Sequence, residues 1–205
     1  MPDLHTMKFS PKFPIRFSFR ILTLQNDFTA TDADGKIVAY VKQKLFKLKE
    51  DVEVFSDLEK TSLLYRIKAD RWIDYSAVYT VTDNNGLPVC KIARKGWRSL
   101  WRASYHILSE EGQELYSITE KSAWVKVMDG LFGEIPILGI FSGYVFHPAY
   151  QVKNKEGICI LELKKRPSFW GKEFSLNLQQ TITEKDEAKI LPSVMMMILL
   201  ERTRG

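Results

Sequence analysis

The chain has 205 residues, of which 45% are hydrophobic and 27% are charged, and this composition is typical of a folded globular protein and excludes general disorder or a fibrous fold. Thirty Lys and Arg against 25 Asp and Glu give a formal net charge of +5, which is compatible with an anionic partner without requiring one. The two cysteines are too few for a disulfide framework or a four-cysteine zinc site, so we expect a reduced, cytoplasmic setting.

The N-terminal segment is polar and is interrupted by proline, and it has no apolar stretch of the kind found in signal peptides. We expect residues 1–12 to be a tail and residues 13–205 to form a single domain. The longest apolar stretches are Ile135–Phe141 and Val194–Leu200, and both are shorter than the roughly 20 residues of a membrane-spanning helix. The sequence therefore predicts no transmembrane span.

Four segments along the chain place an aromatic residue seven positions before a glycine: Phe28–Gly35, Tyr79–Gly86, Tyr105–Gly112 and Tyr150–Gly157. Each has the composition of a strand that runs into a hairpin turn. Elsewhere, as in Phe174–Gln179, apolar and polar residues alternate, which is typical of a strand with one buried face. The glycines are unevenly spaced, so the pattern favours a closed or nearly closed antiparallel sheet over a solenoid or a propeller.

The C-terminal segment differs from the rest because it has the signals of a helix. Thr183 is a candidate N-cap, acidic residues follow it, and Arg202 and Arg204 lie near the end. The stretch from Ile190 to Leu200 is apolar on every side, which predicts a helix inside the sheet. At Pro192 we expect a kink or a new helix start, since proline is tolerated only in the first turn. The predicted core residues of this helix are Ile190, Leu191, Val194, Met195, Met196, Met197, Ile198 and Leu199.

The lysine-bearing segment Val41–Phe55, the Tyr79–Gly86 unit and the apolar C-terminal helix together resemble the LURP-one-related family, of the tubby C-terminal-like and phospholipid-scramblase-like superfamily. The resemblance covers the chain from about Phe17 onward. It implies a mainly β fold, a twelve-stranded antiparallel barrel that encloses a central hydrophobic C-terminal α-helix. Tubby relatives are associated with phosphoinositides, and scramblase relatives with membrane lipids and calcium. We do not extend calcium dependence to this chain, because it has no acidic calcium loop.

Basic residues gather in three runs: Lys36–Lys49, Lys91–Arg102 with two tryptophans, and Lys164–Lys172 with Phe169 and Trp170. Cations mixed with tryptophan suit a membrane interface or a nucleic-acid backbone, although lysines also protect the exposed faces of sheets. We expect strand twist to bring some of these cations onto one face. The residues that we expect to bind lipid headgroups or other anions are Lys42, Lys44, Arg94, Arg98 and Arg102.

Candidate catalytic and metal-ligating residues are scattered. His5, His106 and His147 lie far apart, and Ser142 is out of place for a nucleophile elbow, so we expect no metal, no cofactor and no enzymatic activity. The favoured function is a non-enzymatic, tubby-like binding module that engages phosphoinositides, other anionic lipid headgroups or a membrane surface, at the membrane periphery. The alternatives are a small-molecule carrier barrel and a protein or nucleic-acid interaction module. A helix that fills the lumen would argue against the carrier.

Overall fold

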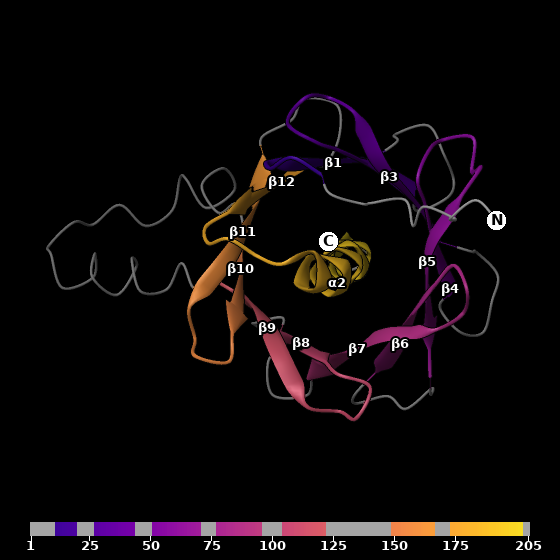
Figure 1. Ribbon diagram of the computed structural model, residues 1–205. Helices are drawn as coiled ribbons and strands as arrows, with labels where there is room; N and C mark the ends of the chain where they lie inside the picture. The colour runs from indigo at the N-terminus through magenta and orange to yellow at the C-terminus, as the bar shows by residue number, and fades with distance from the viewer. Residues whose placement is uncertain are drawn as a thin grey trace, which may run out of the picture.

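The computed structural model describes residues 11–19, 27–43, 51–70, 77–95, 104–121, 149–166 and 173–202. These residues form an antiparallel barrel in which consecutive strands pair and the last strand closes on the first (Figure 1). The predicted fold class, a twelve-stranded barrel around a C-terminal helix, is confirmed. The strands are β1 (Ile15–Phe19), β2 (Asp27–Thr31), β3 (Ile37–Gln43), β4 (Asp51–Phe55), β5 (Leu63–Ala69), β6 (Val78–Asp83), β7 (Pro88–Lys95), β8 (Ser104–Leu108), β9 (Glu114–Glu120), β10 (Ala149–Asn154), β11 (Cys159–Arg166) and β12 (Glu173–Leu178).

The inner face of the barrel is apolar because side chains alternate along each strand. In β1, Ile15, Phe17 and Phe19 are buried, whereas Arg16 between them is exposed. The inward aromatic rings pack against one another, with the ring centroids of Phe17 and Phe28 lying 5.8 Å apart in an edge-on arrangement. The alternation seen in the sequence therefore decides which residues face the core.

Four hairpins share one turn geometry, as the aromatic-to-glycine units predict. In the β6–β7 turn, the amide of Gly86 donates to the carbonyl of Asp83 at 3.1 Å, and the amide of Asp83 donates to the carbonyl of Leu87 at 2.9 Å. The Asp83 carboxylate accepts two further bonds, from the amides of Asn85 and Leu87. Gly86 has φ +80°, a left-handed conformation that side chains disfavour. The glycines with positive φ are Gly35, Gly86, Gly112 and Gly157.

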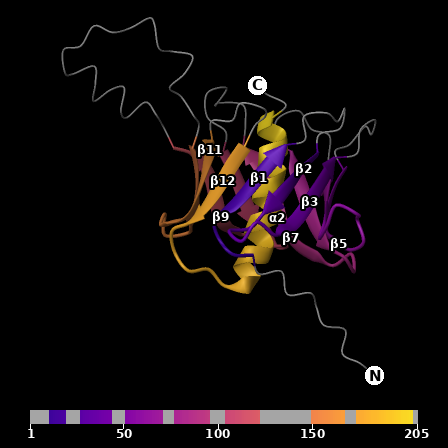
Figure 2. The ribbon, with the colours of Figure 1, turned by 90° about the horizontal axis from the view of Figure 1, so that it is seen from above.

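The C-terminal helix α2 (Glu184–Arg202) runs through the middle of the barrel (Figures 1 and 2). Thr183 caps it, since its hydroxyl oxygen accepts a hydrogen bond from the amide of Asp186 at 3.2 Å and donates one to the carboxylate of Asp186 at 2.7 Å. All eight predicted core residues of the helix are buried, each at most 1% exposed. The sheet therefore surrounds the apolar part of the helix on every side.

The sequence-based prediction left a kink or a new helix start open at Pro192, and the new start is wrong. The helix neither ends nor restarts there, and it is one element from Glu184 to Arg202. An internal proline costs a helix about 3 kcal/mol, because it removes one hydrogen bond and crowds the preceding turn. Leu191 and Val194, which flank Pro192 and Ser193, are completely buried, so packing against the barrel offsets this cost.

The two ends of the barrel differ in construction. In Figure 2 the hairpin end, where α2 starts, is at the bottom, and the helix-exit end, where α2 ends, is at the top. At the hairpin end lie the four glycine turns, the β4–β5 connection and the start of α2. At the helix-exit end, odd-numbered strands end, even-numbered strands begin and α2 ends.

Candidate functional site

Two of the five predicted anion-binding residues, Lys42 and Arg94, lie in the described part of the chain. Lys44, Arg98 and Arg102 lie outside the described residues. Lys42 is the second-last residue of β3 and Arg94 is the second-last residue of β7, so both are near the helix-exit end. Three strands separate β3 from β7 around the barrel. The structure therefore brings Lys42 and Arg94 to the same end without making them neighbours.

Lys42 lies on the outer face of β3, because the preceding residue, Val41, is completely buried on the inner face. Its cross-strand partners are Asp27 on β2 and Glu53 on β4. The sequence run around Lys42 contains no acidic residue, yet the register of the sheet supplies two. Part of the positive charge expected here is therefore balanced within the folded sheet.

Arg94 points to the other side of the barrel wall. It has the same strand parity as Cys90 and Ile92, both completely buried, and it lies opposite the buried Tyr105 on β8. This parity places Arg94 on the inner face, at the mouth of the barrel. Lys42 and Arg94 consequently do not share one binding face.

The wall formed by β2, β3, β4 and β5 is balanced in charge. The guanidinium of Arg66 on β5 donates to both carboxylate oxygens of Asp51 on β4, at 2.8 and 3.1 Å, and lies 3.9 Å from Glu53. These contacts raise the pKa of Arg66 above its usual value, the hydrogen bond to Asp51 contributing most. Asp27 accepts a hydrogen bond from the hydroxyl of Tyr40 at 2.7 Å. The carboxylates of Asp27 and Asp51 and the guanidinium of Arg66 therefore have partners inside the protein.

A second group of cations lies where β1 closes on β12. Arg16 on β1 is opposite Ser175 on β12, and Ser175 is opposite Lys164 on β11, so the three residues form a row across the outer face. Arg166 follows two residues after Lys164 on the same face, and all three cations are exposed. Sequence reasoning found the run Lys164–Lys172 but missed Arg16, because no local pattern shows that the first strand pairs with the last.

One carboxylate on this wall is shared by two lysines. Glu162 lies 2.8 Å from the ammonium of Lys164 and 3.2 Å from that of Lys121. The hydrogen bond from Lys164 is the largest cause that lowers the pKa of Glu162, despite the opposing effect of burial. Glu162 is therefore a charged, paired residue.

The helix-exit end differs from the hairpin end in the sequence of its connections. The six connections that begin and end there contain ten Lys and Arg against five Asp and Glu, and they contain all five tryptophans of the chain. The six connections at the hairpin end contain three Lys and Arg against seven Asp and Glu. These counts come from the sequence, since most connections at the helix-exit end lie outside the described residues. The connections that carry these cations and tryptophans in the sequence therefore all start and finish at strand ends on the same side of the barrel.

The described part of the chain contains few arrangements of side chains that could act in catalysis or bind a metal. No group of three or more His, Cys, Asp and Glu side chains there is arranged to hold a metal ion. His106 lies on the outer face between Ser104, at 3.2 Å, and Glu114, at 2.9 Å. Burial raises the pKa of the Cys90 thiol to about 11, although the Ser193 hydroxyl 3.8 Å away acts in the opposite direction. A thiol of this kind is protonated at neutral pH and is a poor nucleophile.

Among the described residues, no helix is long and apolar enough to cross a membrane. The helix that is apolar on all sides is instead enclosed by the sheet.

A closed antiparallel barrel around a buried C-terminal helix is the arrangement that the resemblance to tubby-like binding modules implies. A family model described as LURP-one-related matches residues 37–197, which is most of the chain. The protein belongs to the LURP-one-related family. No curated protein matches the sequence.

Proposed function

We propose that this protein is a peripheral membrane-binding module that docks on anionic lipid headgroups, phosphoinositides among them, through the helix-exit end of the barrel. The observation that carries the proposal is the gathering of ten cations and five tryptophans in the connections at that end. Tryptophan favours the interface between water and lipid, and lysine and arginine are attracted to anionic leaflets. The opposite end carries an excess of acids, which would orient the barrel against a negative surface.

The predicted residues Lys42, Lys44, Arg94, Arg98 and Arg102 all belong to this proposal, because each lies in a strand or a connection that reaches the helix-exit end. A basic residue near an anionic bilayer contributes about 1 kcal/mol, so several must act together for useful affinity. A common end provides such convergence even though Lys42 and Arg94 lie on opposite faces of the wall.

The carrier alternative is not favoured by the structure. In carrier barrels the ligand lies in the lumen, and here the apolar residues of α2 occupy that volume (Figure 1). Nucleic acid shares the anionic chemistry of lipid headgroups and is therefore an outcome that the test must separate.

The experiment is cosedimentation with phosphatidylcholine vesicles, with and without phosphatidylserine or phosphatidylinositol bisphosphate. We expect binding only to the anionic vesicles, falling steeply as salt rises past about 0.15 M, where the Debye length is about 8 Å. Arg98→Gln/Arg102→Gln should weaken binding by roughly 30-fold, at about 1 kcal/mol per charge. The control Lys155→Gln/Lys185→Gln removes the same charge near the hairpin end and should bind as the wild type does.

Three results would contradict the proposal: equal binding to neutral vesicles, binding that is insensitive to salt, or equal losses in the two double variants. Binding to single-stranded nucleic acid without binding to vesicles would replace it with the nucleic-acid alternative.

A further inference from the structure

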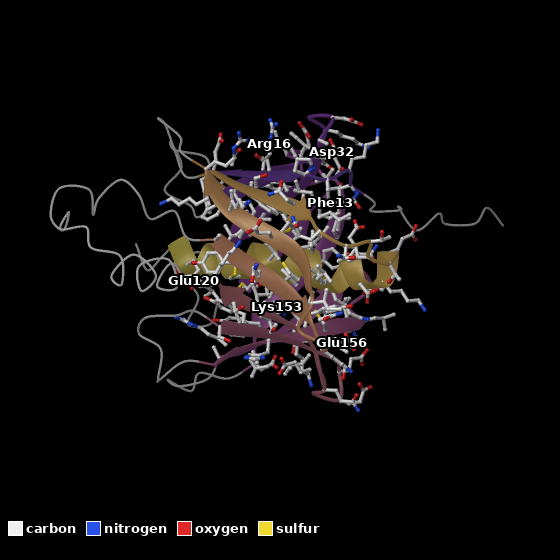
Figure 3. The ribbon with its side chains drawn as sticks, turned by 90° about the vertical axis from the view of Figure 1, so that its left-hand side faces the viewer. Phe13, Arg16, Asp32, Glu120, Lys153 and Glu156 are labelled. Atoms are coloured by element: carbon white, nitrogen blue, oxygen red, sulfur yellow. The ribbon has the colours of Figure 1, made fainter. Side chains whose placement is uncertain are left out.

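The wall of the barrel made by β1, β12 and β11 differs from the rest of the outer face. Because β12 pairs with both β1 and β11, Arg16, Ser175 and Lys164 form one row, with Arg166 two residues further along β11. Adjacent strands are about 4.8 Å apart, so the backbones of Arg16 and Lys164 are separated by about 10 Å. Figure 3 shows Arg16 on the outside of the barrel. Three exposed cations thus lie within reach of one another's side chains.

These cations are only partly neutralised by the acids around them, because Lys164 forms an ion pair with Glu162. Glu162 is already shared between Lys121 and Lys164, and Glu173 is the cross-strand partner of Arg166. Among the described residues, neither Arg16 nor Arg166 forms an ion pair. The wall therefore has an excess of positive charge with two guanidinium groups available to a ligand.

The wall on the other side of β1 has a different arrangement. There the guanidinium of Arg66 is held by both oxygens of Asp51, and Lys42 lies between Asp27 and Glu53. An anion that approached that wall would meet carboxylates and an arginine whose donors are in use. The β1–β12–β11 wall and the β2–β5 wall consequently differ in the charge that they offer to an anion.

The positive wall is continuous with the helix-exit end. Arg166 is the last residue of β11, and Lys164 lies two residues before it. The connection that follows Arg166 contains Phe169, Trp170 and Lys172 in its sequence. A bilayer that contacts the helix-exit end is therefore within reach of this wall when the barrel tilts toward it.

We propose that the β1–β12–β11 wall takes part in the contact that the helix-exit end makes with the bilayer, and that Arg16, Lys164 and Arg166 bind the phosphates of anionic lipid headgroups there. The inference rests on the proposed function and assigns it a place that the family and the sequence do not give. Guanidinium groups suit the role because they donate two parallel hydrogen bonds to a phosphate. The spacing of the row suits a headgroup with more than one phosphate, or two neighbouring lipids.

The test is Arg16→Gln/Arg166→Gln, measured by cosedimentation with phosphatidylcholine vesicles that contain phosphatidylinositol bisphosphate. The control Lys36→Gln/Lys68→Gln removes the same charge from two exposed lysines, one in the β2–β3 turn and one on β5. We expect the arginine variant to bind at least roughly tenfold more weakly than the wild type, and the lysine variant to bind equally well. Thermal unfolding of both variants should match that of the wild type, because all four side chains are exposed.

The outcomes separate this inference from the function on which it rests. Wild-type protein that binds no anionic vesicle would overturn both. Wild-type binding that both variants retain, or that both lose equally, would overturn the place of the site and leave membrane binding intact. An arginine-dependent affinity for soluble inositol phosphate without vesicle binding would show a free phosphate ligand and overturn the lipid assignment.

Discussion

The two ends of the barrel are built by different means. At the hairpin end, four turns repeat the same geometry, and each is closed by backbone hydrogen bonds between residues at most four positions apart. The start of α2 is also capped locally, by Thr183 and Asp186. Short-range sequence signals therefore determine this end almost completely.

The helix-exit end depends on contacts between residues that are distant in sequence. The hydroxyl of Tyr105 on β8 donates to one carboxylate oxygen of Glu201 at 2.5 Å, and the hydroxyl of Tyr150 on β10 donates to the other at 3.2 Å. The cations and tryptophans of this end come from six separate connections. The hairpin end is thus specified by short sequence signals, whereas the helix-exit end depends on long-range contacts and carries the surface that we propose for binding.

The largest expected effect comes from breaking the element that links the two ends. Met196 is completely buried in the middle of α2, so Met196→Asp would bury an unpaired charge. We expect the variant to lose on the order of 4 kcal/mol of unfolding free energy or to fail to fold, whereas Met196→Leu should change it by less than about 1.5 kcal/mol. Urea denaturation followed by circular dichroism measures both. An unchanged midpoint for Met196→Asp would refute the enclosed position of the helix.

The hydrogen bonds that hold the two ends of α2 should contribute different amounts to the unfolding free energy. Tyr105→Phe removes a short hydrogen bond to the carboxyl group of Glu201, which should cost about 2 kcal/mol. Thr183→Ala removes the exposed N-cap at the hairpin end and should cost about 1 kcal/mol. Tyr150→Phe, with the longer bond to Glu201, provides the internal comparison. The same denaturation experiment ranks the three, and a larger loss in Thr183→Ala than in Tyr105→Phe would reverse the comparison.

The sequence was a good guide to the fold because its strongest signals are local. The aromatic-to-glycine units predict hairpins, and the stretch from Ile190 to Leu200 predicts a buried helix, since both patterns act over few residues. The sequence could not decide between a kink and a new helix start at Pro192, because the packing that offsets the cost of the proline comes from the surrounding sheet.

The candidate site was harder to predict, because it depends on the register between paired strands and on the closure of the barrel between β1 and β12. The acidic neighbours of Lys42 are 15 and 11 residues away in sequence and become adjacent only through strand pairing. Arg94 faces inward because it lies an even number of residues from the buried Cys90 and Ile92 on the same strand. A count of charges along the sequence does not show which face of a strand is buried. Arg16 joins Lys164 only because β1 pairs with β12, a contact between the two ends of the sheet.

The hairpin end can be weakened at a single turn. Gly86 has φ +80°, and an added Cβ would meet no atom within 4 Å, so the cost of Gly86→Ala is conformational and not steric crowding by neighbours. We expect a loss of about 1 kcal/mol, because a left-handed backbone disfavours a side chain by roughly this amount. Gly86→Asn should recover part of it, since asparagine tolerates this conformation better. A thermal midpoint for Gly86→Ala equal to that of the wild type would show that this turn does not need glycine.

The smallest expected effect is a pH dependence at the hairpin end. Glu187 lies in the first turns of α2 and is 6% exposed. One of its carboxylate oxygens is buried and has no hydrogen-bond partner among the residues that the structure describes. Burial raises the pKa of Glu187 to about 7, and the nearby charge of Glu184 adds to the shift. Across from it on β5, burial and the charge of Glu187 raise the pKa of Tyr65 to about 12, so that phenol stays neutral.

A carboxyl group whose pKa is higher in the folded state than in the unfolded chain stabilises the fold most at low pH. The contribution of Glu187 is fully present below pH 4.5, its ordinary value, and declines as pH rises through about 7. Between pH 6 and pH 8 the wild type should therefore lose about 1 kcal/mol of unfolding free energy relative to Glu187→Gln, which stays neutral. Denaturation at several pH values measures the difference in unfolding free energy between the two proteins. The other titrating groups are the same in both proteins, so their contributions cancel in this difference. Parallel pH profiles of wild type and Glu187→Gln would show that this carboxyl titrates outside the neutral range.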